Sequence, residues 1–258
     1  SLKCKAELDG DEYVINGQKT WTTLGQFADW IFVLVRTDDS GIKQTGITFI
    51  LVDMKTPGIE VKPIITLDGD HEVNEVWFDN VRVPKENVVG EVNQGWTYAK
   101  FLLTHERSSI AGAPQMRRAI NRLAKKAEKT FHGDNPLSED PTFKAKVAQF
   151  NLDLDALEMT ELRGLAAQRE GNPPGAESSL LKIKGTDLQQ RLSSLAVEIA
   201  GHDAMPYGGP YGFSDIEGAA AKDAQLSAPK YLNFRKVTIY GGTNEIQKNI
   251  IAKAILGL

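Results

Sequence analysis

Three residues near the C-terminus, Gly241–Thr243 (G-G-T), have the types and order that suit binding of a phosphate or a ribose. Glycine lets a backbone approach a ligand closely, and a helix N-terminus offers N–H groups without helical partners. A helix is predicted directly after them from an apolar stripe: Ile246, Ile250, Ile251 and Ala254. Asn244 and Gln247 resemble a capping box for it. The same Gly-Gly-Thr is equally common as a plain turn with an N-cap, so both interpretations stay open.

Other residues with chemical potential are less informative by themselves. Glu106 and Arg107 are neighbours in a predicted helix, where adjacent residues diverge by roughly 100° and do not share a face. Taken alone, Glu106 is a solvated helix glutamate and Trp21 a core aromatic of a strand. Cys4 is the only cysteine, which excludes an internal disulfide and a cysteine-based zinc cluster. We predict no metal site.

Residues 1–92 are predicted to form a β domain. Tyr13–Ile15 lies between the turn signals Asp-Gly and Asn-Gly. The apolar runs Trp30–Val35 and Ile47–Val52 are typical of strands buried on both faces. Val73–Phe78 and Val81–Pro84 complete a set of about six strands with short polar connections. This pattern predicts a small β-barrel or sandwich.

Residues 93–258 are predicted to form a helical domain. Apolar residues recur at helical spacing in two long segments: Phe143, Val147, Phe150, Leu154 and Leu157, and then Leu181, Leu188, Leu192, Leu195 and Ile199. Residues 95–130 are expected to be helical with a kink at Pro114, and the Gly/Pro-rich residues 203–228 to form a loop. The fold class is therefore α+β, with the β domain followed by an up-down bundle of about four long helices.

The composition is that of an ordinary soluble protein. The chain has 258 residues, 41% of them hydrophobic, and a formal net charge of −4. The slight acidity and the scattered Lys and Arg residues argue against nucleic-acid binding. No apolar run approaches the ~20 residues of a membrane span, and no signal peptide is recognisable. Because Ser1-Leu2-Lys3 leads straight into strand-like sequence, we expect residue 1 to lie inside a longer protein, so that targeting cannot be read.

Two segments carry a resemblance to a known family. Ile15–Thr23 (I-N-G-Q-K-T-W-T-T) resembles the I-N-G-x-K-x-W-I-T segment of acyl-CoA dehydrogenases, and Thr238–Gln247 (T-I-Y-G-G-T-N-E-I-Q) is similar to their C-terminal signature. Between them, Val76–Pro84 and Asn93–Trp96 resemble the link between the β and helical domains. The resemblance covers nearly the whole chain in the family's order. The family's N-terminal helical domain and first β strands, which carry part of the ligand pocket, are not in this sequence.

The resemblance implies an FAD-dependent enzyme that removes a proton from Cα and a hydride from Cβ of an acyl-CoA thioester, leaving the trans-2-enoyl-CoA, as in β-oxidation of fatty acids. A base must lie on one side of the substrate and flavin N5 on the other. By position in the family's motifs, Trp21 and Thr23 contact the flavin. Thr243 and Glu245 face the adenosine and diphosphate part, and Gly201 makes a main-chain contact to FAD from a neighbouring subunit. Gly201 suits a helix C-cap equally well.

The catalytic base is where this sequence departs from most of the family. Many members place a glutamate at the position of Gly241, whose N–H still suits the thioester oxygen. A subset, including branched-chain enzymes, has the glutamate before an arginine on the first long helix, and this sequence has Glu106-Arg107 there. We therefore predict Glu106 as the base, its pKa raised by apolar surroundings, and Arg107 as a substrate-side neighbour that fixes local charges. An arginine that binds the FAD diphosphate in many members is also missing from Glu128–Gly133 (E-K-T-F-H-G).

The implied partners are an acyl-CoA substrate and an electron-transferring flavoprotein, in a homodimer, homotetramer or hetero-oligomer. His71–Val76 (H-E-V-N-E-V) and the position of the base resemble a bacterial branch with pimeloyl-CoA dehydrogenase large subunits, which implies a cytoplasmic protein. An acyl-CoA oxidase would use the same residues with O₂ as acceptor. The glycine at 241 also suits a non-catalytic subunit that shares FAD within a hetero-oligomer. A helical interaction module with a β cap is a third interpretation, which absence of bound flavin would favour.

Overall fold

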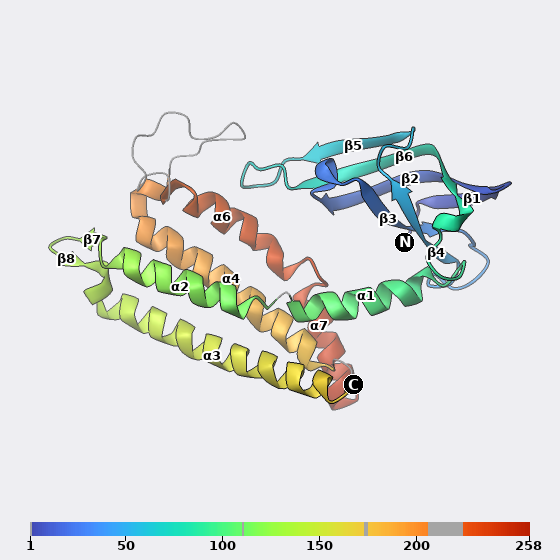
Figure 1. The fold of residues 1–258 in the computed structure, drawn as a ribbon. Helices are drawn as coiled ribbons and strands as arrows, with labels where there is room; N and C mark the ends of the chain where they lie inside the picture. Colours follow the sequence, from blue (N-terminus) through green and yellow to red (C-terminus); the bar gives the residue numbers. More distant parts are fainter. Residues whose placement is uncertain (1, 110, 173–174, 206–223) are drawn as a thin grey trace. The chain divides into compact units, whose positions relative to one another are not determined.

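A computed structural model describes residues 2–109, 111–172, 175–205 and 224–258, apart from the side chains of residues 104–109 and 132. The chain divides into two compact units, Ser1–Leu102 and Leu103–Leu258. Each unit is described by itself below, and Figure 1 traces both along the chain. The predicted boundary between residues 92 and 93 stays a prediction.

The first unit is a single mixed sheet with strand order β4-β3-β1-β2-β6-β5. Its strands are β1 (Lys5–Asp9), β2 (Glu12–Thr23), β3 (Trp30–Arg36), β4 (Ile47–Asp53), β5 (Ile59–Ile64) and β6 (Val73–Pro84). All neighbours pair antiparallel except β1 and β3, which are parallel. The α+β class is confirmed, although within residues 2–102 the edge strands β4 and β5 do not pair to close a barrel.

Apolar side chains on one face of the strands form the core of the sheet. Val33 and Val35 of β3 are fully buried, whereas Trp30 and Phe32, which alternate with them, are at least half exposed. The prediction that β3 is buried on both faces is therefore wrong, because only one of its faces packs on the core. β4 comes closer to that prediction, since Ile47, Phe49 and Ile50 are all buried.

The second unit is helical. Its helices are α1 (Gly95–Ser109, which contains the boundary between the units), α2 (Ala113–Ala127), α3 (Pro141–Arg169), α4 (Glu177–Ala200), α6 (Ser227–Asn233) and α7 (Asn244–Ile251). Between α2 and α3 lies a small hairpin of β7 (Phe131–His132) and β8 (Asn135–Pro136). Most of the predicted loop at 203–228 lies outside the described residues.

Pro114 does not kink a long helix, as the sequence suggested, but occupies the first turn of a new one. α1 ends at Ser109 and α2 begins at Ala113, after Gly112 in the left-handed conformation with φ 62°. Proline is well accepted in a first turn because the N–H that it lacks would have no helical partner there. The helix break therefore precedes the proline.

Helix α4 is the central element of this unit. It contacts α2, α3, α6 and α7, and in Figure 1 it runs, in orange, alongside α2 and α3. The core includes the predicted stripe residues Phe143, Phe150, Leu154 and Leu157 of α3, and Leu181, Leu188, Leu195 and Ile199 of α4. Arg117 ties α2 to α3 through Asn151, Asp155 and Glu158, with 2.9 Å between its Nη2 and Glu158 Oε2.

A glycine allows the link between α1 and α2 to lie directly on α4. A Cβ at Gly185 would be 2.7 Å from Ala111 Cα and 3.0 Å from its carbonyl oxygen. Such distances are far inside van der Waals contact, and the obstructing atoms are main chain, which cannot rotate away. Gly185 is therefore required by packing, in spite of the poor helix propensity of glycine.

We predict opposite effects of the same substitution in α3 and α4. Gly185→Ala should lower the free energy of unfolding by about 1–3 kcal/mol, because the added methyl overpacks the contact with Ala111. Gly164→Ala is the matched control: Gly164 lies inside α3, and outside the backbone of that helix no atom of the described residues lies within 4 Å of the place that its Cβ would take. It should raise stability by about 0.5–1 kcal/mol. Calorimetry of both variants tests this, and an unchanged or raised Tm for Gly185→Ala contradicts it.

Candidate functional site

In the first unit, the predicted flavin-contacting residues lie at an irregular end of β2. Thr20 pairs with Glu75 and Thr22 with Asn74, so Trp21 is left over as an extra residue. This β-bulge places Trp21 at φ 66°, in the left-handed region. Its side chain is 66% exposed, which contradicts the interpretation of Trp21 as a core aromatic. Thr23, at the end of the strand, is exposed as well.

Buried and half-buried amides surround this bulge. Asn74, which is 0% exposed, donates through Nδ2 to the Thr22 carbonyl oxygen at 3.0 Å and to Gln26 Oε1 at 2.6 Å. His71 Nε2 lies 2.6 Å from Asn74 Oδ1. None of these residues was predicted to support the cofactor site, although His71 and Asn74 lie in the segment that resembles a bacterial branch of the family. The available signal was the polar Asn74 at an inward position of β6, in register with the buried Val76 and Phe78.

In the second unit, Gly241 and Gly242 form a turn before α7. Both have positive φ angles, 64° and 87°, which glycine adopts without strain. Gln247, which is fully buried, donates through Nε2 to the carbonyl oxygens of Gly241 at 3.2 Å and Gly242 at 3.4 Å. A side chain at 242 would come within 2.4 Å of that Nε2. The turn is therefore held by a side chain of the helix that follows it.

Thr243, and not Asn244 as the predicted capping box had it, is the N-cap of α7. Its Oγ1 accepts a hydrogen bond from the Ile246 N–H at 3.3 Å. Gln247 turns back to the glycine carbonyls instead of to the N-cap N–H. Asn244 has a different partner, since its Oδ1 accepts from Lys182 Nζ at 2.9 Å. The plain N-cap and the glycine turn thus occur together, and the two interpretations of Gly-Gly-Thr do not exclude each other.

The charges beside this turn are one exposed carboxylate and one buried ammonium. The pKa of Glu245 is lowered, first by its own backbone N–H and then by the Thr243 hydroxyl. Lys182 on α4 is 0% exposed, and burial lowers its pKa, against the opposing effect of the Glu245 carboxylate. A buried Lys is unusual, and the amphipathic pattern of α4 did not single it out.

The remaining predicted residues lie on helices α1 and α4. Gly201 is the C-cap of α4, with φ 56°, and its N–H bonds to the Val197 carbonyl oxygen, so the C-cap interpretation holds. It is exposed, and among the described residues no atom other than those of Gly201 and its chain neighbours lies within 4 Å of where a Cβ would be. Glu106 and Arg107 lie in the last turns of α1. Their side chains lie outside the described part of the chain, so the position of the predicted base carboxylate stays a prediction.

Taken separately, each unit offers one kind of ligand-binding surface. An exposed indole next to an exposed hydroxyl, at Trp21 and Thr23, offers a flat apolar surface with a hydrogen-bonding group beside it. A glycine turn at a helix N-terminus, at Gly241–Thr243, suits a phosphate or ribose. Among the described residues, no group of three or more His, Cys, Asp or Glu could hold a metal ion.

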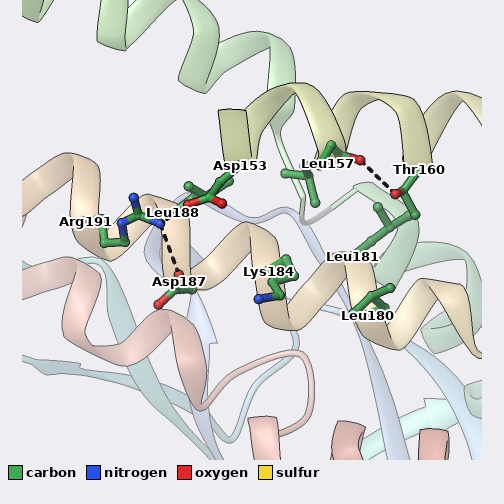
Figure 2. Close-up of a pocket in the computed structure, with 10 residues that line it drawn as sticks. Asp153, Leu157, Thr160, Leu180, Leu181, Lys184, Asp187, Leu188 and Arg191 are labelled. Carbon is green, nitrogen blue, oxygen red and sulfur yellow. Dashed lines mark hydrogen bonds and ion pairs between the residues drawn. The ribbon is translucent and has the colours of Figure 1, made fainter. Parts of the chain in front are cut away.

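A pocket of about 310 Å³ between α3 and α4 contains none of the predicted site residues (Figure 2). Its walls are apolar, with Leu157, Leu181 and Leu188, and its rim is ionic. Arg191 bonds to Asp153 at 2.5 Å and lies 3.7 Å from Asp187. Because Arg191 pairs with Asp153 and Asp187 at the rim and none of the predicted site residues lines the pocket, we assign it to the packing between α3 and α4.

None of the helices in the described ranges is both long and apolar enough to cross a membrane.

Comparisons with known proteins cover almost the entire chain. Residues 1–81 match the family model described as acyl-CoA dehydrogenase, middle domain, and residues 93–256 match acyl-CoA dehydrogenase, C-terminal domain. The acyl-CoA dehydrogenase IpdE1 of Mycobacterium tuberculosis is 34% identical over 260 residues, covering 100% of this chain and 63% of the relative. The chain thus spans slightly less than two thirds of the length of this relative.

Solved structures agree with this assignment. The structure titled "Tcur3481-Tcur3483 steroid ACAD G363A variant" has a TM-score of 0.85 and 28% identity, covering 100% of this chain and 64% of that one. The ChsE4-ChsE5 complex from Mycobacterium tuberculosis has a TM-score of 0.81 and 28% identity, with 100% and 65% covered. Two family models match in order along the sequence, and a relative is 34% identical over the whole of this chain, so this chain belongs to the acyl-CoA dehydrogenase family.

Proposed function

We propose that the protein to which this chain belongs is an FAD-dependent acyl-CoA dehydrogenase that converts an acyl-CoA thioester into the trans-2-enoyl-CoA. Family membership supports the reaction class, since acyl-CoA dehydrogenases are FAD-dependent flavoproteins. The observation that carries the proposal is the exposure of Trp21 on a bulge next to Thr23. A residue held in a sparsely populated backbone conformation lowers stability, and such residues cluster at ligand-binding and catalytic sites.

Each predicted residue has a defined part in this reaction. Glu106 takes the Cα proton, and the N–H of Gly241 donates to the thioester oxygen, where negative charge develops as the proton leaves. When bound, FAD accepts the hydride that leaves Cβ. Arg107 fixes the local charges beside the base. The glycine turn supports the part assigned to Gly241, because Gln247 holds the two carbonyl groups of the turn in place.

Five residues are proposed to hold the cofactor. The indole of Trp21 packs on the flavin, and the Thr23 hydroxyl donates or accepts a hydrogen bond near N5. Thr243 and Glu245 lie along the adenosine and diphosphate part, where the N-terminus of α7 offers its N–H groups. Gly201 contributes its main chain to the FAD of a neighbouring subunit. Gly201 is exposed, and no other part of the described chain fills the place of a side chain there, which supports this role.

The names of the relatives suggest a bulky or branched acyl group as substrate. One matching structure is titled a steroid ACAD, and a 28% identical relative from Geobacter metallireducens, covering 99% of this chain and 64% of its own length, is a cyclohexane-1-carbonyl-CoA dehydrogenase. We therefore propose cyclic acyl-CoA thioesters beside the dicarboxylyl-CoA thioesters, such as pimeloyl-CoA, that the sequence suggested. An electron-transferring flavoprotein is the proposed acceptor, and the protein is proposed to act in the cytoplasm.

A second candidate function is that of a non-catalytic subunit that shares FAD within a hetero-oligomer. Gly241 favours it, because the side chain that acts as base in many members is missing at this position. The structural relatives titled ChsE4-ChsE5 complex and Tcur3481-Tcur3483 steroid ACAD each combine two named proteins. The two candidates differ in whether the flavin is reduced by a base of this chain.

We predict that Glu106→Gln in the flavin-loaded full-length protein slows flavin reduction by acyl-CoA at least about 100-fold, since glutamine cannot accept the proton. Anaerobic mixing with a panel of linear, dicarboxylyl and cyclic acyl-CoA thioesters, followed by the loss of the flavin absorption band, measures the rate. Glu128→Gln, at the exposed C-cap of α2, is the control and should reduce at the wild-type rate. Reduction of Glu106→Gln as fast as wild type excludes Glu106 as the base, whereas a wild-type protein that binds FAD but is not reduced by any of the thioesters favours the non-catalytic subunit.

We further predict that Trp21→Ala raises the dissociation constant for FAD roughly threefold to tenfold, the usual worth of an aromatic stacking contact. Flavin fluorescence during titration of the apoprotein measures it. Trp77→Ala serves as a matched control, because Trp77 is explained by contacts within the sheet. Its Nε1 donates to Glu75 Oε2 at 3.0 Å, and Lys62 Nζ lies 5.2 Å from its ring. Equal FAD affinities for Trp21→Ala and wild type contradict the assignment of Trp21.

A further inference from the structure

The bulge at Trp21 needs support from its surroundings. Tryptophan carries a bulky ring on Cβ and reaches the left-handed region only when other contacts hold it there. At φ 66° it stands between two residues that keep their pairing with β6, Thr20 with Glu75 and Thr22 with Asn74. A bulge of this kind redirects one side chain out of the alternation of the strand. Whatever holds the main chain after Trp21 therefore also decides where its indole points.

Asn74 is bonded directly to the main chain next to Trp21. Its Nδ2 donates to the Thr22 carbonyl oxygen at 3.0 Å, one residue after the bulge. The Thr22 side chain also lies close to Gly25. A Cβ added to Gly25 would lie 3.2 Å from Thr22 Cγ2 and 3.5 Å from Asn74 Nδ2. Asn74 thus holds the Thr22 carbonyl oxygen, and the Thr22 side chain lies against Gly25.

The orientation of Asn74 is itself fixed by two other side chains. Its second N–H donates to Gln26 Oε1 at 2.6 Å, so its Oδ1 must face His71 Nε2, 2.6 Å away, and that nitrogen is the donor. Gln26 in turn donates through Nε2 to the His71 carbonyl oxygen at 3.1 Å. The three residues close a ring through the main-chain carbonyl of His71, and both N–H groups and the oxygen of the Asn74 side-chain amide have partners.

The same two segments are also joined through their backbones. The Leu24 N–H donates to the Glu72 carbonyl oxygen at 2.8 Å. Residues 22–26 are therefore tied to residues 71–74 at several points, and the segment that contains Thr23 cannot shift along the strand by itself. The alternative is that these bonds only satisfy the buried amide of Asn74. That would account for one or two of them, but not for a ring of bonds that also holds the main chain beside the strained Trp21.

We propose that Asn74 is a positioning residue for the flavin: with His71 and Gln26, it holds the Trp21 bulge so that the indole and the Thr23 hydroxyl are presented to the cofactor. The inference rests on the flavin role proposed above for Trp21 and Thr23. It adds that this role depends on a buried amide that touches neither cofactor nor substrate. Asn74 acts on FAD only through the main chain of β2.

Asn74→Asp is the sharpest test, because aspartate keeps the shape and the acceptor for His71 but has no N–H for Thr22 or Gln26. It should raise the dissociation constant for FAD of the full-length apoprotein roughly threefold to tenfold, as Trp21→Ala does. In the double variant Trp21→Ala/Asn74→Asp, the two losses should not add, since Asn74 works through Trp21. A crystal structure of Asn74→Asp should show residue 21 outside the left-handed region.

Thr48→Val is the matched control for loss of a buried hydrogen bond elsewhere in the sheet. Thr48 is 0% exposed, its Oγ1 lies 2.7 Å from Thr37 Oγ1, and it accepts from the Asn93 N–H at 2.9 Å. This variant should lower Tm and leave FAD affinity unchanged. If Asn74→Asp behaves in the same way, or if its effect adds fully to that of Trp21→Ala, Asn74 is a structural residue and the inference is wrong.

Gln26→Met keeps the experiment decisive if Asn74→Asp fails to fold. Gln26 is only partly buried, and methionine keeps its length while removing its bonds to Asn74 and to the His71 carbonyl. The variant should weaken FAD binding in the same direction, and wild-type affinity would overturn the inference. If Trp21→Ala itself leaves FAD affinity unchanged, the proposed function of Trp21 fails. If Trp21→Ala weakens FAD binding but the Asn74 and Gln26 variants bind FAD as wild type does, the flavin role of Trp21 stands and the positioning role of Asn74 fails.

Discussion

Irregular backbone inside a protein must find hydrogen-bond partners that helices and sheets would otherwise supply, and both predicted cofactor segments depend on this constraint. At the end of β2, the Thr22 carbonyl oxygen is bonded by the side-chain amide of Asn74. At the turn before α7, the carbonyl oxygens of Gly241 and Gly242 are bonded by the side-chain amide of Gln247. Both amides are fully buried. In each unit, then, one primary amide serves as a substitute for a missing main-chain donor.

The end of β2 and the turn before α7 have different residues, yet both expose groups suited to a ligand and both have irregular backbone held by a buried amide. A strand can expose a tryptophan only by departing from its alternation, and a helix can expose its first N–H groups only if the preceding turn keeps clear of them. Each departure leaves carbonyl groups pointing into the protein. An amide is suited to bonding them because it carries no charge and so has a modest desolvation cost.

Much of the fold could be predicted from the sequence, because periodicity reports burial directly. The α3 and α4 stripes and the strand pattern of β2, β4 and β6 indicated the right elements and the α+β class. The prediction was wrong where the same local sequence pattern is compatible with two structures. Trp30–Val35 is apolar throughout, yet only Val33 and Val35 pack on the core. Pro114 could kink a helix or begin one, and the left-handed Gly112 before it decided for the second.

The site was predictable in its motifs but not in their support. Trp21, Thr23 and Gly241–Thr243 could be named because their types match a family signature. The support given by Asn74, Gln26 and His71 could not be predicted, because the bonds that join residues 22–26 to residues 71–74 link positions 45–52 residues apart in the sequence, which no local pattern encodes. Lys182 was missed for a related reason. Its place on the inward side of α4 becomes understandable only once Asn244 is seen to accept its ammonium group.

The close approach of α4 to Ala111 at Gly185 has a mechanical consequence. Where side chains separate two elements, small movements are absorbed as the side chains change rotamer. Here main chain faces main chain, with no space for even a methyl group between them. A tilt of α4 would push directly on the segment that follows α1, only a few residues beyond Glu106. At this contact, α4 and Ala111 are therefore expected to move together, because no side chain lies between them to absorb a displacement.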